Sequence, residues 1–297
     1  MAIARASNIS PLIIGLTIVA IGTSAPELVT TLEASLSGAK DMALGNIIGS
    51  NIVNVLLILG IAAVICPINV SHQIITRETI MLIAATGLFF TVGRFGIFNQ
   101  LEGILFLLVL AAYLTITYRA EKAHSKSKIN TKVTSDDVER VPEKKWVASL
   151  YIFVGIVGII IGAKLTISGG IGVAEVLQVS QSMIGLTLIA IGTSLPELAI
   201  VFVASLRRQS HIALGNILGS NLFNILGIIG AVSIITPLKM PTELINFDLW
   251  VLITITVLLL PLMITEKKIS RFEGSFLIFL YIIYFSLQFS SFKNIFI

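Results

Sequence analysis

The hexapeptide Gly22-Thr23-Ser24-Ala25-Pro26-Glu27 recurs almost unchanged later in the chain, as Gly192-Thr193-Ser194-Leu195-Pro196-Glu197. Both copies lie inside apolar stretches. A carboxylate placed in the hydrocarbon of a membrane costs at least about 2.5–3.5 kcal/mol on insertion scales. Because the chain buries a carboxylate twice in the same local context, a bound positive charge must compensate this cost. We therefore expect two half-sites that close on one cation.

Composition defines the class of protein. Hydrophobic residues make up 56% of the 297 residues and charged residues only 12%, whereas a soluble domain has roughly 25% charged residues. The sequence therefore predicts an all-α membrane protein with several spanning helices. A single cysteine and three histidines exclude a disulfide framework and argue against a metal site rich in cysteine or histidine. We find no nucleophile–base pair, so we expect no enzyme activity.

An internal repeat surrounds the two hexapeptides. Residues 15–56 align with residues 185–226 without a gap, and about 24 of the 42 positions are identical. Both copies keep the costly polar residues, which argues against the alternative that only one copy still works. The second part of each copy reads Gly-Asn-x-x-Gly-Ser-Asn-x-x-Asn, and it stands at Gly45–Asn51 with Asn54 and at Gly215–Asn221 with Asn224.

A membrane span needs about 20 predominantly apolar residues. Between the spans, only residues 119–146 form a long polar connection, which we interpret as a linker between an N-terminal repeat (1–118) and a C-terminal repeat (147–297). We expect nine spans, at about 9–35, 42–66, 78–96, 101–118, 147–173, 182–206, 211–236, 247–265 and 273–291.

The basic residues predict the orientation, because cytoplasmic loops carry an excess of Lys and Arg. With the linker in the cytoplasm, about fifteen basic residues fall inside and four outside. The helix that carries Glu27 then runs from inside to outside, and the helix that carries Glu197 runs the opposite way. Two inverted-topology repeats are typical of secondary transporters with a site at the membrane midplane.

The symmetry of the repeat is incomplete at the beginning of the sequence. Residues 171–174 align with residues 1–4, so the helix at 147–173 has almost no counterpart before residue 1. Full symmetry would need ten helices. We expect either a reading frame that begins too late or a chain that has lost its first helix, and the intact remainder of the repeat favours the former.

The hexapeptide supplies oxygen ligands. Pro26 and Pro196 each remove a backbone donor and free carbonyl groups near Gly22 and Gly192. Unpaired carbonyls within a membrane must line a cavity or meet a ligand. Together with hydroxyls and a carboxylate, they form a set of hard donors that suits sodium, calcium or magnesium rather than zinc or copper.

A second helix in each repeat adds further oxygen atoms. Ser50 and Asn54 are four residues apart, so they share a helix face and can reach the same ion as the hexapeptide. Two ionised glutamates carry the charge that one calcium ion cancels, and calcium takes about six to eight oxygen ligands. Without calcium, repulsion between the carboxylates favours protons or monovalent cations in the site. The residues therefore predict a site that exchanges calcium for monovalent cations.

Taken together, these motifs resemble the two alpha-repeats of the sodium/calcium exchanger family, within the calcium/cation antiporter superfamily. The family signature is Gly-Thr-Ser-x-Pro-Glu followed by Gly-Asn-x-x-Gly-Ser-Asn, and the similarity is greatest to prokaryotic members. The resemblance implies a ten-helix fold with four cation sites near the midplane. It also implies an integral protein of the prokaryotic plasma (inner) membrane. The basic residues place the N-terminus and the 119–146 linker in the cytoplasm.

The resemblance also implies a role for each motif residue. Glu27 and Glu197, with Thr23 and Thr193, would form the calcium site. Asn54 and Asn224 would line the middle, and the asparagine at 224 argues against potassium dependence, because potassium-dependent members are among those with an aspartate there. Flanking sodium sites would use Ser24, Ser50, Ser194 and Ser220 with the backbone carbonyls of Ala20 and Ala190.

We therefore expect an antiporter that exchanges calcium for sodium by alternating access. Three alternatives stay open at this point: a proton-coupled cation exchanger on the same scaffold, an inactive truncated exchanger, and a passive cation channel, against which the paired half-sites speak. The expected partners are calcium, sodium and the lipid bilayer, with protons as a further candidate. We expect no cofactor, no nucleic acid and no obligate protein partner.

Overall fold

A computed structural model describes residues 15–70, 74–127 and 145–293. Five of the described helices are long and apolar enough to cross a membrane, and there are seven candidate spans if each of two bent helix pairs counts as one. The two remaining predicted spans coincide with the helices at Lys145–Leu177 and Arg271–Lys293. The prediction of an all-α polytopic membrane protein is confirmed.

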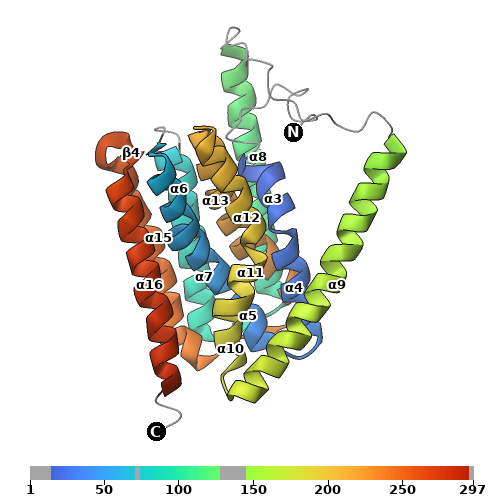
Figure 1. Ribbon diagram of the computed structural model, residues 1–297. Coiled ribbons are helices and arrows are strands. Elements are labelled where there is room, and N and C mark those ends of the chain that lie inside the picture. The colour runs from blue at the N-terminus through green and yellow to red at the C-terminus, as the bar shows by residue number, and fades with distance from the viewer. Residues whose placement is uncertain (1–14, 71–73, 128–144, 294–297) are drawn as a thin grey trace.

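The N-terminal repeat contains helices interrupted by π-helical turns, labelled η, and two short strands (Figure 1). Its elements are η1 (Gly15–Val19), α3 (Ala20–Thr23), α4 (Ala25–Leu36), α5 (Lys40–Ile52), η2 (Val53–Ile58), α6 (Leu59–Ile65), β1 (Ile68–Asn69), η3 (Ile74–Thr79), α7 (Ile80–Phe95), β2 (Ile97–Phe98) and α8 (Gln100–Ser127). Helix α8 therefore continues into the first residues of the segment expected to be a linker.

From η4 onwards the C-terminal repeat follows the same order of elements, with one additional 3₁₀ turn, and the helices α9 and α10 come before η4. Its elements are α9 (Lys145–Leu177), α10 (Gln181–Ile184), η4 (Gly185–Ile189), α11 (Ala190–Thr193), α12 (Leu195–Leu206), α13 (Ser210–Leu222), η5 (Phe223–Ile228), α14 (Ile229–Ile235), β3 (Leu238–Lys239), η6 (Leu244–Asp248), α15 (Leu249–Ile264), the 3₁₀ turn η7 (Thr265–Lys267), β4 (Lys268–Ile269) and α16 (Arg271–Lys293).

The short strands show that the two repeats are inverted. Strand β1 pairs with β4, and β2 pairs with β3, both antiparallel. The two ladders lie at opposite ends of the bundle, since η3 and α7 run between β1 and β2 over roughly 30 Å. Helix α6 ends at the first ladder, near β4 in Figure 1, while its counterpart α14 ends at the second. Equivalent helices therefore run in opposite directions.

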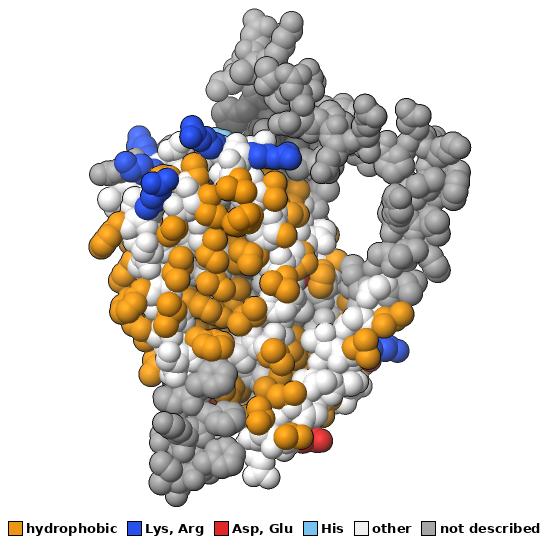
Figure 2. Space-filling view, in the orientation of Figure 1, with side chains coloured by type: hydrophobic (Ala, Val, Ile, Leu, Met, Phe, Trp, Pro, Cys, Tyr) orange, Lys and Arg blue, Asp and Glu red, His pale blue; other side chains and the backbone are white. Residues whose placement is uncertain are grey.

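The outer surface suits a bilayer. Large apolar side chains are exposed along several helices, for example Leu108 at 62% and Phe279 at 56%. Figure 2 shows hydrophobic side chains over the wall of the bundle and most of the visible Lys and Arg side chains at one end of it. Such a wide apolar surface is stable only against lipid or another apolar partner.

Glycines allow helices of the two repeats to pack closely at the centre. Helix α5 packs against η4 and α11, and α13 packs against η1 and α3 in the same way. A Cβ atom added at Gly219 would lie 2.5 Å from the carbonyl oxygen of Leu16 and 2.8 Å from Cβ of Ala20. The glycines at these crossings therefore set the distance between the two hexapeptides.

Replacing Gly219 by alanine is expected to push η1 and α3 away from α13, because the added methyl group would overlap backbone. Overpacking of this kind costs about 1–3 kcal/mol. A lower thermal unfolding temperature of the purified protein would show the effect. As a control, Gly87→Ala lies in a helix where an added Cβ meets nothing within 4 Å, and it should not lower the unfolding temperature, because alanine favours a helix over glycine. An unchanged unfolding temperature for Gly219→Ala would contradict the close packing.

Candidate functional site

Each hexapeptide breaks a membrane span. The helix before Ser24 and the helix after it meet at 46°, and the equivalent helices at Ser194 meet at 45°. Pro26 stands in the first turn of α4, where its missing N–H group is tolerated. The amide of Ser24 donates to the carbonyl of Ala20 at 2.9 Å, and the chain turns there. The sequence-based expectation of a helix loosened at the proline agrees with this geometry.

The two glutamates are fully buried and each contacts the hexapeptide of the other repeat. Glu197 Oε1 accepts hydrogen bonds from Ser24 at 3.0 Å and from Ser220 at 3.3 Å. Glu27 Oε1 accepts one from Ser194 at 3.3 Å. Ser24 and Ser194, which make these contacts, each stand three residues before the glutamate of their own repeat. The carboxylates of the two repeats therefore lie near each other, between the breaks of α3–α4 and α11–α12.

The two threonines form a second pair of contacts between the repeats. Thr23 Oγ1 lies 3.3 Å from Asn216 Oδ1 and 3.4 Å from Ser220 Oγ. Thr193 Oγ1 lies 3.1 Å from Asn46 Oδ1 and 3.5 Å from Ser50 Oγ. Each threonine thus meets the α5 or α13 helix of the opposite repeat, and the hydroxyls gather around the glutamates.

A group of asparagines continues the polar centre along η2 and η5. Asn54 Nδ2 donates to Asn221 Oδ1 at 2.9 Å, and Asn221 Nδ2 donates to the carbonyl of Asn51 at 3.4 Å. Both η2 and η5 are π-helical, a geometry frequent at functional sites. Asn224, three residues after Asn221, is also fully buried.

Several buried acceptors in this centre have no hydrogen-bond partner among the described residues. They are Glu27 Oε2, Glu197 Oε2, Asn51 Oδ1, Asn54 Oδ1 and Asn224 Oδ1, and Asn224 Nδ2 is equally unpartnered. Buried polar atoms are nearly always satisfied in native proteins. Five unsatisfied oxygen atoms on the motif residues, four of them on predicted site residues, therefore require further groups that they can bind.

The twelve residues predicted for the site are all described and all buried. The carbonyls of Ala20 and Ala190 already accept the amide of the serine four residues later, at 2.9 and 3.1 Å, so a ligand would use their second lone pair. No three histidine, cysteine, aspartate or glutamate side chains form a metal-binding group in the described part of the chain. The donors around the glutamates are instead hydroxyls and amides.

Five polar residues of this centre lie outside the twelve predicted site residues: the asparagines at 46, 51, 216 and 221, and Thr31. The asparagines all lie in the repeated Gly-Asn-x-x-Gly-Ser-Asn motif, so the repeat itself is the signal that could have identified them. Thr31 carries no such signal, because valine stands at the equivalent position 201.

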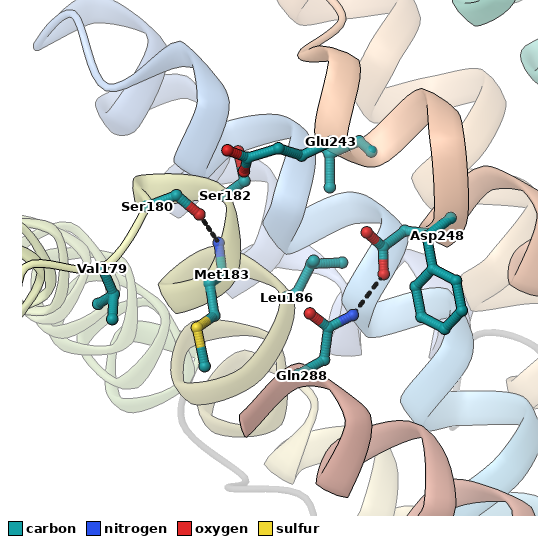
Figure 3. A pocket seen from close by; sticks show the side chains of 10 residues that line it. Val179, Ser180, Ser182, Met183, Leu186, Glu243, Asp248 and Gln288 are labelled. Carbon is teal, nitrogen blue, oxygen red and sulfur yellow. Dashed lines mark hydrogen bonds between the residues drawn. The ribbon is translucent and has the colours of Figure 1, made fainter. Parts of the chain in front are cut away.

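A second pair of buried acids lies outside this centre. Tyr113 donates to Glu78, and Tyr284 donates to Asp248 at 2.8 Å. Asp248 also borders a cavity of about 320 Å³ between α10, η6 and α16 (Figure 3). Gln288 donates to Asp248 Oδ1 at 2.6 Å across this cavity. None of the twelve predicted site residues lines it, so the cavity is separate from the glutamate centre.

Comparison with known proteins agrees with the motifs. The profile of the family described as "Sodium/calcium exchanger protein" matches residues 1–119 and 147–290. The sodium/calcium exchanger MaX1 of Methanosarcina acetivorans is 32% identical over 94% of this chain and 89% of its own length. The inner membrane protein YrbG of Escherichia coli is 34% identical over 78% of this chain and 72% of its own length.

A solved structure of the sodium-calcium exchanger NCX_Mj, soaked with sodium and strontium ions, superposes with a TM-score of 0.71 at 32% sequence identity. The match covers 96% of this chain and 89% of that one. Because the family profile spans most of the sequence and full-length relatives are more than 30% identical, the chain belongs to the sodium/calcium exchanger family.

Proposed function

We propose that this protein exchanges calcium for sodium across the membrane by alternating access, at a site built on Glu27 and Glu197. The observation that carries the proposal is the group of four buried, unpartnered oxygen atoms on Glu27, Glu197, Asn54 and Asn224. An unsatisfied buried acceptor is expensive. Cations bound in this centre would supply the partners that these atoms lack.

The charge of the site favours a divalent ion. Two fully buried carboxylates need a compensating positive charge. One calcium ion supplies it, and sodium ions in the same centre supply it in part. Because both kinds of ion would use the same glutamates, they compete, and this competition couples their transport. The names of the relatives and of the superposed structure support calcium and sodium as the pair.

Within this proposal the residues divide into three groups. Glu27, Glu197, Thr23 and Thr193 bind calcium. Asn54 and Asn224 line the middle of the site. Sodium binds at flanking positions formed by Ser24, Ser50, Ser194 and Ser220 with the carbonyls of Ala20 and Ala190, and no separate cofactor takes part.

The proposed location is the plasma membrane of a prokaryote, with the N-terminus and residues 119–146 in the cytoplasm. The basic end of the bundle in Figure 2 supports this orientation, because Lys and Arg are retained on the cytoplasmic side. Residues such as Arg207, Arg208 and Arg271 belong to this end, at the end of α12 and the beginning of α16.

The test is calcium uptake into vesicles that contain the purified full chain. Vesicles loaded with sodium and diluted into sodium-free buffer should take up labelled calcium. Vesicles that carry only a pH gradient, with no sodium on either side, should take up none. A calcium gradient should in turn drive sodium across the membrane in the opposite direction.

Other outcomes separate the alternatives. Uptake under the pH gradient alone would replace sodium with protons as the counter-ion. Uptake that needs no counter-ion would indicate a channel. The absence of uptake under every gradient would contradict antiport by this polypeptide, and a calcium-binding measurement on the same protein would then show whether the ion site is present.

A further inference from the structure

Two buried asparagines lie behind the threonines of the ion site. Asn46 and Asn216 occupy equivalent positions on α5 and α13 and are 1% and 0% exposed. The hydroxyl of Thr193 donates to Asn46 Oδ1 at 3.1 Å, and that of Thr23 donates to Asn216 Oδ1 at 3.3 Å. Each asparagine therefore contacts the threonine of the opposite repeat.

The position of a hydroxyl proton determines whether a threonine can bind a cation. A hydroxyl group has one proton and two lone pairs, and only a lone pair can face a cation. The proton of Thr193 must therefore point away from the ion, towards an acceptor. The carbonyl of Ala190 is one candidate at 3.4 Å, but it already accepts the amide of Ser194. Asn46 Oδ1 is nearer, and among the described residues Thr193 is the donor that it has. On the other side, Thr23 Oγ1 lies 3.2 Å from the carbonyl of Ala20 and 3.3 Å from Asn216 Oδ1, and the Ala20 carbonyl likewise already accepts the amide of Ser24.

The two repeats differ in what holds the asparagine. Asn46 Nδ2 donates to Thr31 Oγ1 at 3.0 Å, which fixes the amide with its oxygen towards Thr193. In the second repeat Val201, 1% exposed, stands where Thr31 would be. Accordingly, Asn216 Nδ2 is a buried donor without a partner in the described part of the chain.

On the basis of the ion site proposed above, we propose that Asn46 and Asn216 are positioning residues that accept the threonine protons, and that Thr31 fixes only one of them. Thr31 is suited to this role because it lies four residues after Glu27, on the same face of α4. The Thr193 side of the site is then preorganised for a cation. On the Thr23 side the side-chain amide of Asn216 can flip, and Nδ2 would then face Thr23 in place of Oδ1.

A reciprocal pair of substitutions tests the inference. Thr31→Val makes the first repeat like the second, and Val201→Thr gives the second repeat the acceptor that it lacks. Loss of one hydrogen bond that orients a ligand corresponds to about a threefold to tenfold change in affinity. We expect Thr31→Val to weaken calcium binding by that factor and Val201→Thr to strengthen it about threefold.

The measurements are calcium binding to the purified protein by calorimetry and the KM and maximal rate of sodium-driven calcium uptake. A positioning role changes KM and leaves the maximal rate within about twofold, because binding is affected and not the conformational change. Thr31→Ser keeps the hydroxyl acceptor and should restore wild-type affinity. Thr30→Val makes the same chemical change one residue earlier, on a different face of α4, and should leave calcium affinity unchanged.

Two results would overturn the inference. One is wild-type calcium affinity in both Thr31→Val and Val201→Thr. If Glu27→Gln has lost binding in the same experiment, the proposed function stands and only this inference fails. The other is equal weakening by Thr31→Ser and Thr31→Val, which would show that packing and not the hydroxyl is responsible. If Glu27→Gln binds calcium normally, the proposed function itself fails. Should Thr31→Val not fold, Val201→Thr decides alone, since it adds an acceptor for an unpartnered donor.

Discussion

Replacing Glu27 by glutamine is expected to abolish sodium-driven calcium uptake, and replacing Glu197 is expected to do the same. Each substitution keeps the size of the side chain but removes one of the two negative charges that would hold the ion. It also places an amide group, which donates hydrogen bonds, where an unpartnered carboxylate oxygen now lies. Removing one partner of a buried ion pair costs about 3–5 kcal/mol. Calcium affinity should therefore fall roughly 100-fold or more.

Glu33 supplies the control for this prediction. It lies on α4 with Glu27, is half-buried, and has valine at its place in the second repeat. Glu33→Gln removes the same charge from the same helix, and its calcium affinity should stay within about twofold of wild type. Calorimetric titration with calcium compares all three variants. Wild-type affinity in Glu27→Gln or Glu197→Gln would exclude the two-glutamate site.

The architecture was predictable because the chain contains two copies of the same motif, which can be compared with each other. A single copy of the hexapeptide would show only a proline and a carboxylate in a hydrophobic segment. Two copies at a constant offset show which polar residues are kept together, and the basic residues then predict that the copies are inverted. The pairing of β1 with β4 and of β2 with β3 expresses that inversion directly.

The contacts inside the site could not be predicted in the same way. The repeat shows that Ser24 and Ser194 are equivalent, but it does not show that Ser24 donates to Glu197 while Ser194 donates to Glu27. These partners lie more than 160 residues apart, and the packing of α5 and α13 across the centre brings them together. The role of Thr31 was hidden for the opposite reason, since it breaks the symmetry on which the prediction depended.

Replacing Asn224 by leucine is expected to stabilise the ion-free protein and to disable transport. Both polar atoms of the Asn224 side chain are buried and lack a hydrogen-bond partner within the described structure. Each such atom destabilises a folded protein by about 1–3 kcal/mol, and leucine has nearly the same size without the polar atoms. The thermal unfolding temperature in calcium-free detergent solution should therefore rise. Sodium-driven calcium uptake should fall about tenfold or more, because an oxygen that would line the ion site is lost.

Added calcium should affect the thermal stability of the wild-type protein and of Asn224→Leu differently. A ligand stabilises the folded state by an amount that grows with its concentration relative to Kd. Wild-type protein should therefore gain more thermal stability from added calcium than Asn224→Leu, and the difference between them should shrink or reverse at high calcium. A constant difference at all calcium concentrations would show that Asn224 does not contact the ion.

Thr86→Val is the matched control for this last prediction. Thr86 Oγ1, on α7, is also a buried atom without a hydrogen-bond partner in the described structure, but it is not among the residues of the glutamate centre. Its replacement should raise the unfolding temperature and leave calcium uptake unchanged. If removing an unsatisfied polar atom stabilises the protein and leaves transport intact, that atom is a packing defect. If its removal stabilises the ion-free protein and stops transport, the atom binds the ion, and we expect Asn224 to behave in this second way.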